Sequence, residues 1–159
     1  MKHVHLMILL AAGACSIPAH AADPRHSPPQ AMPMPPHDAR QLVRFPLQVK
    51  RETLATMRRH LQGLAAIQAA LADDHFGEAA RIATMTLGMS SMATNQGEEE
   101  ARYMPPDMKM LGMQLHRQAE AFALAAQNAA VTGDTRKPLR LLSRLTQTCV
   151  ACHAAYRLR

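Results

Sequence analysis

Residues 136–156 read RKPLRLLSRLTQTCVACHAAY, and this stretch decides the class of fold. Its apolar side chains recur at steps of three and four residues, which is the period of one face of an α-helix. Pro138 falls where a first helical turn tolerates proline, after a capping residue at Asp134 or Thr135. We therefore expect a helix here, with a stripe formed by Leu142, Leu145, Cys149, Cys152 and Tyr156.

The same period recurs in three segments upstream, residues 46–73, 74–88 and 105–133. Prolines at the start of the first and third segments suit a first turn, and glycines at the end of the second and third favour helix termination. We expect an all-α fold, an antiparallel up-down-up-down four-helix bundle over residues 46–159, with a polar loop between the second and third helices. The seam expected on the first helix consists of Leu54, Met57, Leu61, Leu64 and Leu71, and Ala65 and Ile67 widen this face.

The composition agrees with helices and excludes other classes of protein. Apolar residues make up 48% of the chain, yet it has three Phe, two Tyr and no Trp, and its apolar share comes largely from Ala, Leu and twelve Met. These are strong helix formers, so a β-sandwich or barrel is excluded. Three Cys are too few for a disulfide scaffold. The predicted core is short of bulky groups.

Residues 1–21 resemble a secretory signal peptide. Lys2 precedes an apolar run of about 11 residues, too short to span a bilayer, and small residues stand at Ala19 and Ala21. We expect cleavage after Ala21 and a periplasmic location, with the formal net charge falling from +6 to +5. In the alternative, a loose lipoprotein box before Cys15 gives a lipid-anchored protein on the periplasmic side, the one case in which membrane association is expected.

Residues 22–45 are rich in proline, which favours an extended linker. This segment also contains His26, Met32, Met34 and His37, side chains that Cu(I) accepts as ligands. A solvated linker is the favoured interpretation, and a copper site is the alternative.

Cys149, Cys152 and His153 form the sequence CxxCH, the attachment signature of a c-type haem. One helical turn separates the two sulfurs, so both can bond one edge of a porphyrin, and the following histidine can ligate the iron. A thioredoxin-like redox pair needs a βαβ context, and a zinc site needs further ligands at suitable spacing. We therefore expect one covalent haem c, bound by Cys149 and Cys152, with His153 as the proximal iron ligand.

With Tyr156 and Arg157 the motif extends to CxxCHxxYR on the last helix, and the chain here resembles the cytochrome c′ superfamily. The resemblance covers about residues 46–159. It implies a four-helix bundle with a covalent haem near the C-terminus, and in this family the first helix covers the other face of the iron. The family also often dimerises through its first two helices, and the sequence leaves the choice between monomer and homodimer open.

The sixth iron position divides the possible functions. Met57 lies in the apolar seam of the first helix and is our candidate for the distal ligand, as in the low-spin Met-ligated branch of the family. His60 is a second candidate, and a five-coordinate iron with no protein ligand on that side is a third. Relatives often carry a basic residue one turn earlier, where this chain has Thr53.

We expect a periplasmic mono-haem electron-transfer protein rather than an enzyme, since no hydrolytic or phosphoryl-transfer motif is present. Its positive charge favours acidic redox partners, and dispersed basic residues together with export argue against nucleic acid as a partner. The alternative is a five-coordinate haem protein that binds NO or CO. Without haem, the chain is expected to fold poorly.

Overall fold

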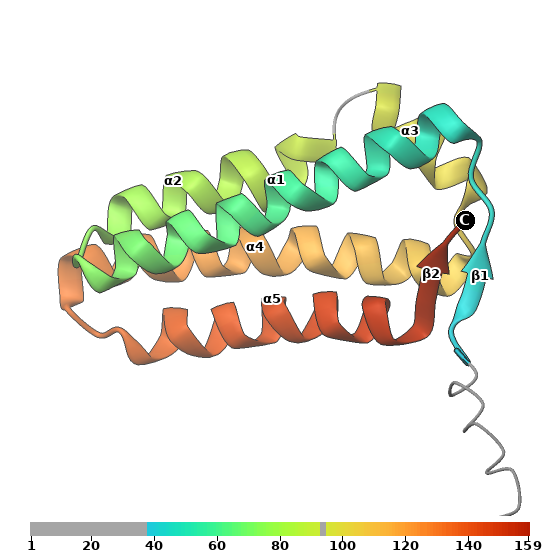
Figure 1. The fold of residues 1–159 in the computed structure, drawn as a ribbon. Coiled ribbons are helices and arrows are strands. Elements are labelled where there is room, and N and C mark those ends of the chain that lie inside the picture. Colours follow the sequence, from blue (N-terminus) through green and yellow to red (C-terminus); the bar gives the residue numbers. More distant parts are fainter. Residues whose placement is uncertain (1–37, 93–94) are drawn as a thin grey trace, which may run out of the picture. The chain divides into compact units, whose positions relative to one another are not determined.

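The computed structural model describes residues 38–92 and 95–159, apart from the side chains of residues 95 and 96. The predicted signal peptide, Cys15 and the possible copper ligands lie outside these residues. The described chain is mainly helical, which confirms the all-α class (Figure 1). Its elements are β1 (Gln41–Val43), α1 (Leu47–Ala72), α2 (Phe76–Leu87), the 3-10 helix η1 (Met89–Met92), α3 (Asn95–Tyr103), α4 (Pro106–Thr132), α5 (Arg136–Ala155) and β2 (Tyr156–Leu158).

The long helices begin and end close to the predicted residues. Gly133 ends α4 in the left-handed conformation, with φ of 73°, which glycine adopts without strain. The prediction for α2 was less accurate. Asp74 does not cap this helix, because it takes a positive φ of 56° in the turn after α1, and α2 begins at Phe76. At the start of α5, Asp134 Oδ1 accepts a hydrogen bond of 3.1 Å from the Arg136 amide.

The predicted polar loop between α2 and α4 is wrong in part, because it contains the short helix α3. Acidic side chains stand near its start and a basic one near its end, the order that the helix dipole favours. Glu99 forms an ion pair of 3.4 Å with Arg102 and accepts a hydrogen bond of 3.2 Å from the Tyr103 hydroxyl. These local contacts stabilise a helix that the apolar period does not reveal.

The last helix ends earlier than its apolar stripe predicts. Tyr156 leaves α5 as its C-cap in an extended conformation and opens β2. This strand pairs in parallel with β1, so that Leu42 is opposite Arg157. The first and last described segments are therefore joined, and residues 38–45 of the predicted linker belong to the folded unit.

The main core is built from small side chains around a few larger ones. Packing runs from α1 to α2, from α2 to α4 and from α4 to α5, whereas α1 and α5 make almost no direct contact. Phe122, Ile67, Leu87 and Leu145 are fully buried. They pack among alanines of α2 and α4, which let the helix axes approach closely: Ala79, Ala80, Ala83, Ala119, Ala123 and Ala126.

The buried face of α1 differs from the predicted seam. None of the five predicted seam residues is fully buried, and Leu61 is 68% exposed. The buried residues are Val49, Thr53, Gly63, Ile67 and Ala70. Gly63 and Ala70 on this face allow α2 to approach closely. Ile67 is fully buried, and Leu64 and Leu71 pack against the main core, whereas Leu54, Met57 and Leu61 do not belong to it. Among the described helices, none is long and apolar enough to cross a membrane.

Candidate functional site

The CxxCH motif occupies the last two turns of α5. Cys149 and Cys152 are half-buried free thiols, and His153 is exposed beside them. Cys149 Sγ lies 3.7 Å from the carbonyl oxygen of Leu145, one turn back along the helix. The structure thus presents two thiols and an imidazole close together at one end of a helix, the donor set that covalent haem attachment requires.

Burial raises the pKa of the Cys149 thiol. Burial also raises the pKa of Cys152, and the nearby Cys149 adds to this effect. The pair lies near the C-terminus of α5, where the helix dipole disfavours a thiolate. Thioredoxin-like cysteines have lowered pKa values, so these thiols do not fit a dithiol redox centre.

Cys152 packs against a second apolar cluster at the end of the helices. Val43 of β1, Phe45, Val49 of α1 and Met108 of α4 form the buried part of this cluster. Met104, Tyr156 and Leu158 pack around them. Sequence reasoning missed this cluster, because half of its members come from segments predicted to be a linker and a helix end. It shields one thiol of the motif from water.

Charged residues join the two chain ends next to this cluster. Arg40 binds Asp38 through two side-chain nitrogens, at 2.9 and 2.8 Å, and its third nitrogen lies 3.5 Å from the His153 carbonyl oxygen. Hydrogen bonds from Arg40 hold the pKa of Asp38 well below its usual range. Arg157 Nε lies 3.4 Å from Asp38 Oδ2. Arg40 and Asp38 therefore link the start of β1 to His153 and to β2.

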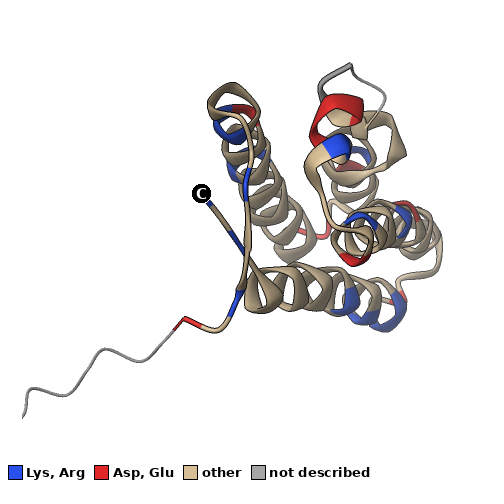
Figure 2. Cartoon of the chain, turned by 90° about the vertical axis from the view of Figure 1, so that its right-hand side faces the viewer, with Lys and Arg blue, Asp and Glu red and all other residues tan. Residues whose placement is uncertain are grey.

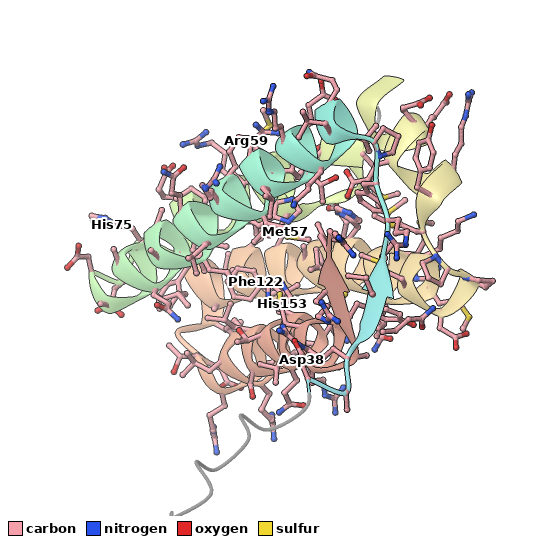
Figure 3. All side chains as sticks on the ribbon, turned by 45° about the vertical axis from the view of Figure 1, so that its right-hand side comes forward. Asp38, Met57, Arg59, His75, Phe122 and His153 are labelled. Carbon is pink, nitrogen blue, oxygen red and sulfur yellow. The ribbon has the colours of Figure 1, made fainter. Side chains whose placement is uncertain are left out.

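Met57 lies on the face of α1 that the main core leaves uncovered. In Figure 3 it is on the side of α1 turned toward α4 and α5, whereas Arg59 is on the opposite side. Met57 and Leu54 are both half-buried, and among the described residues they belong to neither apolar cluster. With Leu61 they form a row at helical spacing, which we call the α1 apolar row. Leu64, one turn further along the helix, packs against the main core.

His60 does not belong to this row, because its ring meets His116 of α4. The ring centroids are 5.9 Å apart in an edge-to-face arrangement. His116 Nδ1 donates a hydrogen bond of 2.8 Å to the Leu87 carbonyl oxygen. Burial lowers the pKa of His60 to about 4, helped by His116 and Arg59, and burial also lowers the pKa of His116.

Thr53, the position at which the resemblance expects a basic residue, is buried on α1. Its hydroxyl has no hydrogen bond of normal geometry, although it lies close enough to Glu100 of α3 to lower the pKa of that carboxyl slightly. Burial is the larger effect and raises the pKa of Glu100 overall. A polar contact between α1 and α3 thus replaces the expected charge.

In the described residues, no three histidine, cysteine, aspartate or glutamate side chains are grouped so that they could hold a metal ion. Compared with known proteins, the chain matches no protein-family model, no curated protein and no solved structure.

Proposed function

We propose that this chain is an exported mono-haem c-type cytochrome of the cytochrome c′ type that transfers electrons. Cys149 and Cys152 would hold the haem covalently, with His153 and Met57 as axial ligands of the iron. The bound haem would supply a one-electron Fe(III)/Fe(II) couple. The observation that carries the proposal is the position of the CxxCH motif relative to the α1 apolar row.

The contacts support an antiparallel four-helix bundle of α1, α2, α4 and α5. Three-residue connections follow α1 and α4, which favours antiparallel neighbours. Between α2 and α4, Thr84 meets Glu120 while Leu87, further along α2, meets His116, earlier on α4. Helices α2 and α4 thus run in opposite directions, and α1 and α4 run in the same direction.

Contacts between helices also give the level of Met57 along the bundle. The rings of His60 and His116 are in contact, so these two residues mark one level on α1 and α4. Met57 is three residues before His60 on α1, and Met113 is three residues before His116 on α4, which runs in the same direction. Because each residue advances a helix by about 1.5 Å, Met57 and Met113 share a level.

The level of His153 follows from a second contact. The Thr148 hydroxyl of α5 donates a hydrogen bond of 2.7 Å to Gln118 of α4. His153 is five residues after Thr148 on α5, and Met113 is five residues before Gln118 on α4. Because the two helices are antiparallel, His153 and Met113 stand at the same level. His153 and Met57 therefore stand at about the same level on α5 and α1, which supports them as the two residues that would hold the iron.

The faces of the two helices agree with this pairing. Thr148 turns toward α4, and Cys149 lies about 100° further round α5, with His153 on the same face one turn later. On α1, Gly63 turns toward Thr86 of α2, and Met57 lies about 120° round the helix from it. The Met57 face of α1 therefore lies away from the contact with α2, and the Cys149 face of α5 lies beside the contact with α4. Helices α1 and α5 themselves make almost no contact.

The chain's own residues then have separate roles. The two cysteines would fix the cofactor to α5, and the imidazole of His153 would supply a nitrogen ligand from the same helix. The Met57 thioether is a soft ligand that favours Fe(II) and raises the reduction potential. The α1 apolar row would exclude water from the haem, and covering this row would bury apolar surface that the chain alone leaves exposed.

Absorption spectra of the reduced, purified protein with and without CO test the proposed function. Two protein ligands predict a low-spin spectrum that CO does not change. A high-spin spectrum that shifts on adding CO would support the gas-binding alternative and contradict electron transfer through a six-coordinate iron.

A further inference from the structure

We propose that the outer face of α5 is a docking surface for an acidic redox partner protein. This inference rests on the proposed function and assigns the partner to one face of the molecule. The surface consists of five exposed residues at steps of three and four, which we call the α5 basic stripe: Lys137, Arg140, Arg144, Gln147 and Ala151.

Charge on this helix has one sign. Within α5 there are basic residues and no acidic ones, and Figure 2 shows blue without red along this lowest helix, which leads to the C-terminus. Asp134 pairs with Arg136 at 3.4 Å. In the described part of the chain, no carboxylate comes within ion-pair distance of Lys137, Arg140 or Arg144, so their charges are available to a partner.

These charges oppose the helix dipole. Arg136, Lys137 and Arg140 lie in the first turns of α5, and the first turn holds no acidic residue. A cation near a helix N-terminus is unfavourable, because it meets the positive end of the helix dipole. Lys137 therefore works against the stability of its own helix, whereas Arg140 and Arg144 stand further along α5, where the dipole effect has faded.

A groove runs beside the stripe, between α4 and α5. Its volume is about 460 Å³, and no acidic residue lines it. Next to it, an adjoining hollow that shares Leu111 and Gln114 is lined by Arg117 and Asp107. The lining of the groove consists mostly of amides and a guanidinium, which donate hydrogen bonds to carboxylates: Leu111, Gln114, Gln118, Arg144, Gln147, Thr148 and Ala151.

The stripe ends beside the motif that would hold the haem. Ala151 stands between the two cysteines of the motif, exposed at the surface of α5. A partner bound to the stripe would be separated from the proposed covalent attachment only by the width of α5. A helix that binds a membrane surface buries large apolar side chains among the lipids. The stripe contains no such side chain, so it does not fit a membrane surface. Carboxylates on the surface of a folded protein are the occupant that this chemistry fits.

A charge-reversal experiment tests the assignment. The full exported protein is titrated at low salt with a short poly-glutamate peptide, and binding is followed by fluorescence anisotropy and by amide chemical shifts. The test variant is Arg140→Glu with Arg144→Glu. The matched control is Arg58→Glu with Arg59→Glu, which makes the same change of charge at exposed positions of α1. Electron-transfer rates with ferricyanide are measured on the same samples.

We expect peptide affinity and ferricyanide rate to fall about tenfold in the α5 variant and less than about twofold in the control. Equal losses in both variants would overturn the docking surface. So would binding to anionic phospholipid vesicles that depends on the stripe while peptide binding does not. A haem-free protein would contradict the proposed function. The peptide titration would still test whether the α5 basic stripe binds carboxylates.

Discussion

The hydroxyl of Thr148 on α5 donates a hydrogen bond of 2.7 Å to Oε1 of Gln118 on α4, and Thr148 is 5% exposed. Among the side-chain hydrogen bonds that join α5 to α4, this one lies nearest to the CxxCH motif. It sets the level of α5 against α4, and Cys149 follows it directly in the chain. The position of the proposed haem site therefore depends on this side-chain pair together with the packing of Leu142 and Leu145 in the main core.

We predict that Thr148→Val lowers the free energy of unfolding by about 1 kcal/mol, because valine has the same shape but cannot donate to Gln118. Urea unfolding followed by circular dichroism measures the change. Thr146→Val is the control, since Thr146 is exposed and bonds to Leu142 in its own helix. Equal stabilities of the two variants would show that the bond to Gln118 does not hold α5.

Close packing of α1 on α2 gives a second prediction. A Cβ atom at Gly63 would stand 3.0 Å from Thr86 Cβ and still closer to its hydroxyl, which is bonded to the Ile82 carbonyl oxygen. We expect Gly63→Ala to destabilise the protein by about 1–3 kcal/mol through overpacking.

Gly77→Ala is the control for this prediction. It lies in α2 with open space where a Cβ would be. Alanine is the better helix former, so this variant should gain about 0.5–1 kcal/mol. Thermal unfolding of both variants measures the difference, and a Gly63→Ala protein as stable as the parent would contradict the close approach of the helices.

The limits of the long helices could be predicted from sequence because they depend on local signals. Pro46, Gly88 and Gly133 mark ends within one residue of those observed. The strands β1 and β2 could not be predicted in this way. Gln41 pairs with Tyr156 across almost the whole described chain, and no local pattern reports such a contact.

The candidate site was likewise predictable where local spacing defines it and not predictable where packing between distant segments decides. CxxCH identifies Cys149, Cys152 and His153 from spacing alone, whereas the buried face of α1 could not be found from apolar periodicity. Gly63 faces α2 because a small residue permits close approach, which apolar periodicity does not report. Ile67, expected on the predicted face, is fully buried. Leu61 was predicted to be in the core and is largely exposed.

The pair of His60 and His116 predicts a pH dependence of stability. The folded-state pKa of His60, about 4, is below its ordinary value of 6.5, so the unfolded chain binds more protons between these values. Stability is full above about pH 6.5 and falls as the pH is lowered toward 4. Urea unfolding at several pH values should show this loss.

Replacing His60 with phenylalanine keeps the ring and removes the titrating group. We expect the loss of stability between pH 6.5 and 4 to become smaller in this variant. His75→Gln, which removes an exposed histidine, is the control. A His60→Phe protein with the pH dependence of the parent would show that other groups are responsible.

The proposed distal ligand gives a prediction with a spectroscopic readout. Met57→Ala removes the thioether, and the ring of His60 is already engaged with His116. Without CO, the reduced variant should therefore have a high-spin spectrum where the parent has a low-spin one. It should also bind CO, which the parent should not. Met85→Ala, at a 63% exposed methionine of α2, should leave the spectrum unchanged. A Met57→Ala spectrum identical to that of the parent would exclude Met57 as a ligand.

The mass of the intact, exported protein tests the central claim most directly. The account predicts the mature polypeptide plus one haem, with the haem retained after denaturation, and the loss of this added mass in a variant with both Cys149→Ala and Cys152→Ala. A parent protein with the mass of the polypeptide alone, or a haem that denaturation releases, would contradict covalent attachment through these two cysteines.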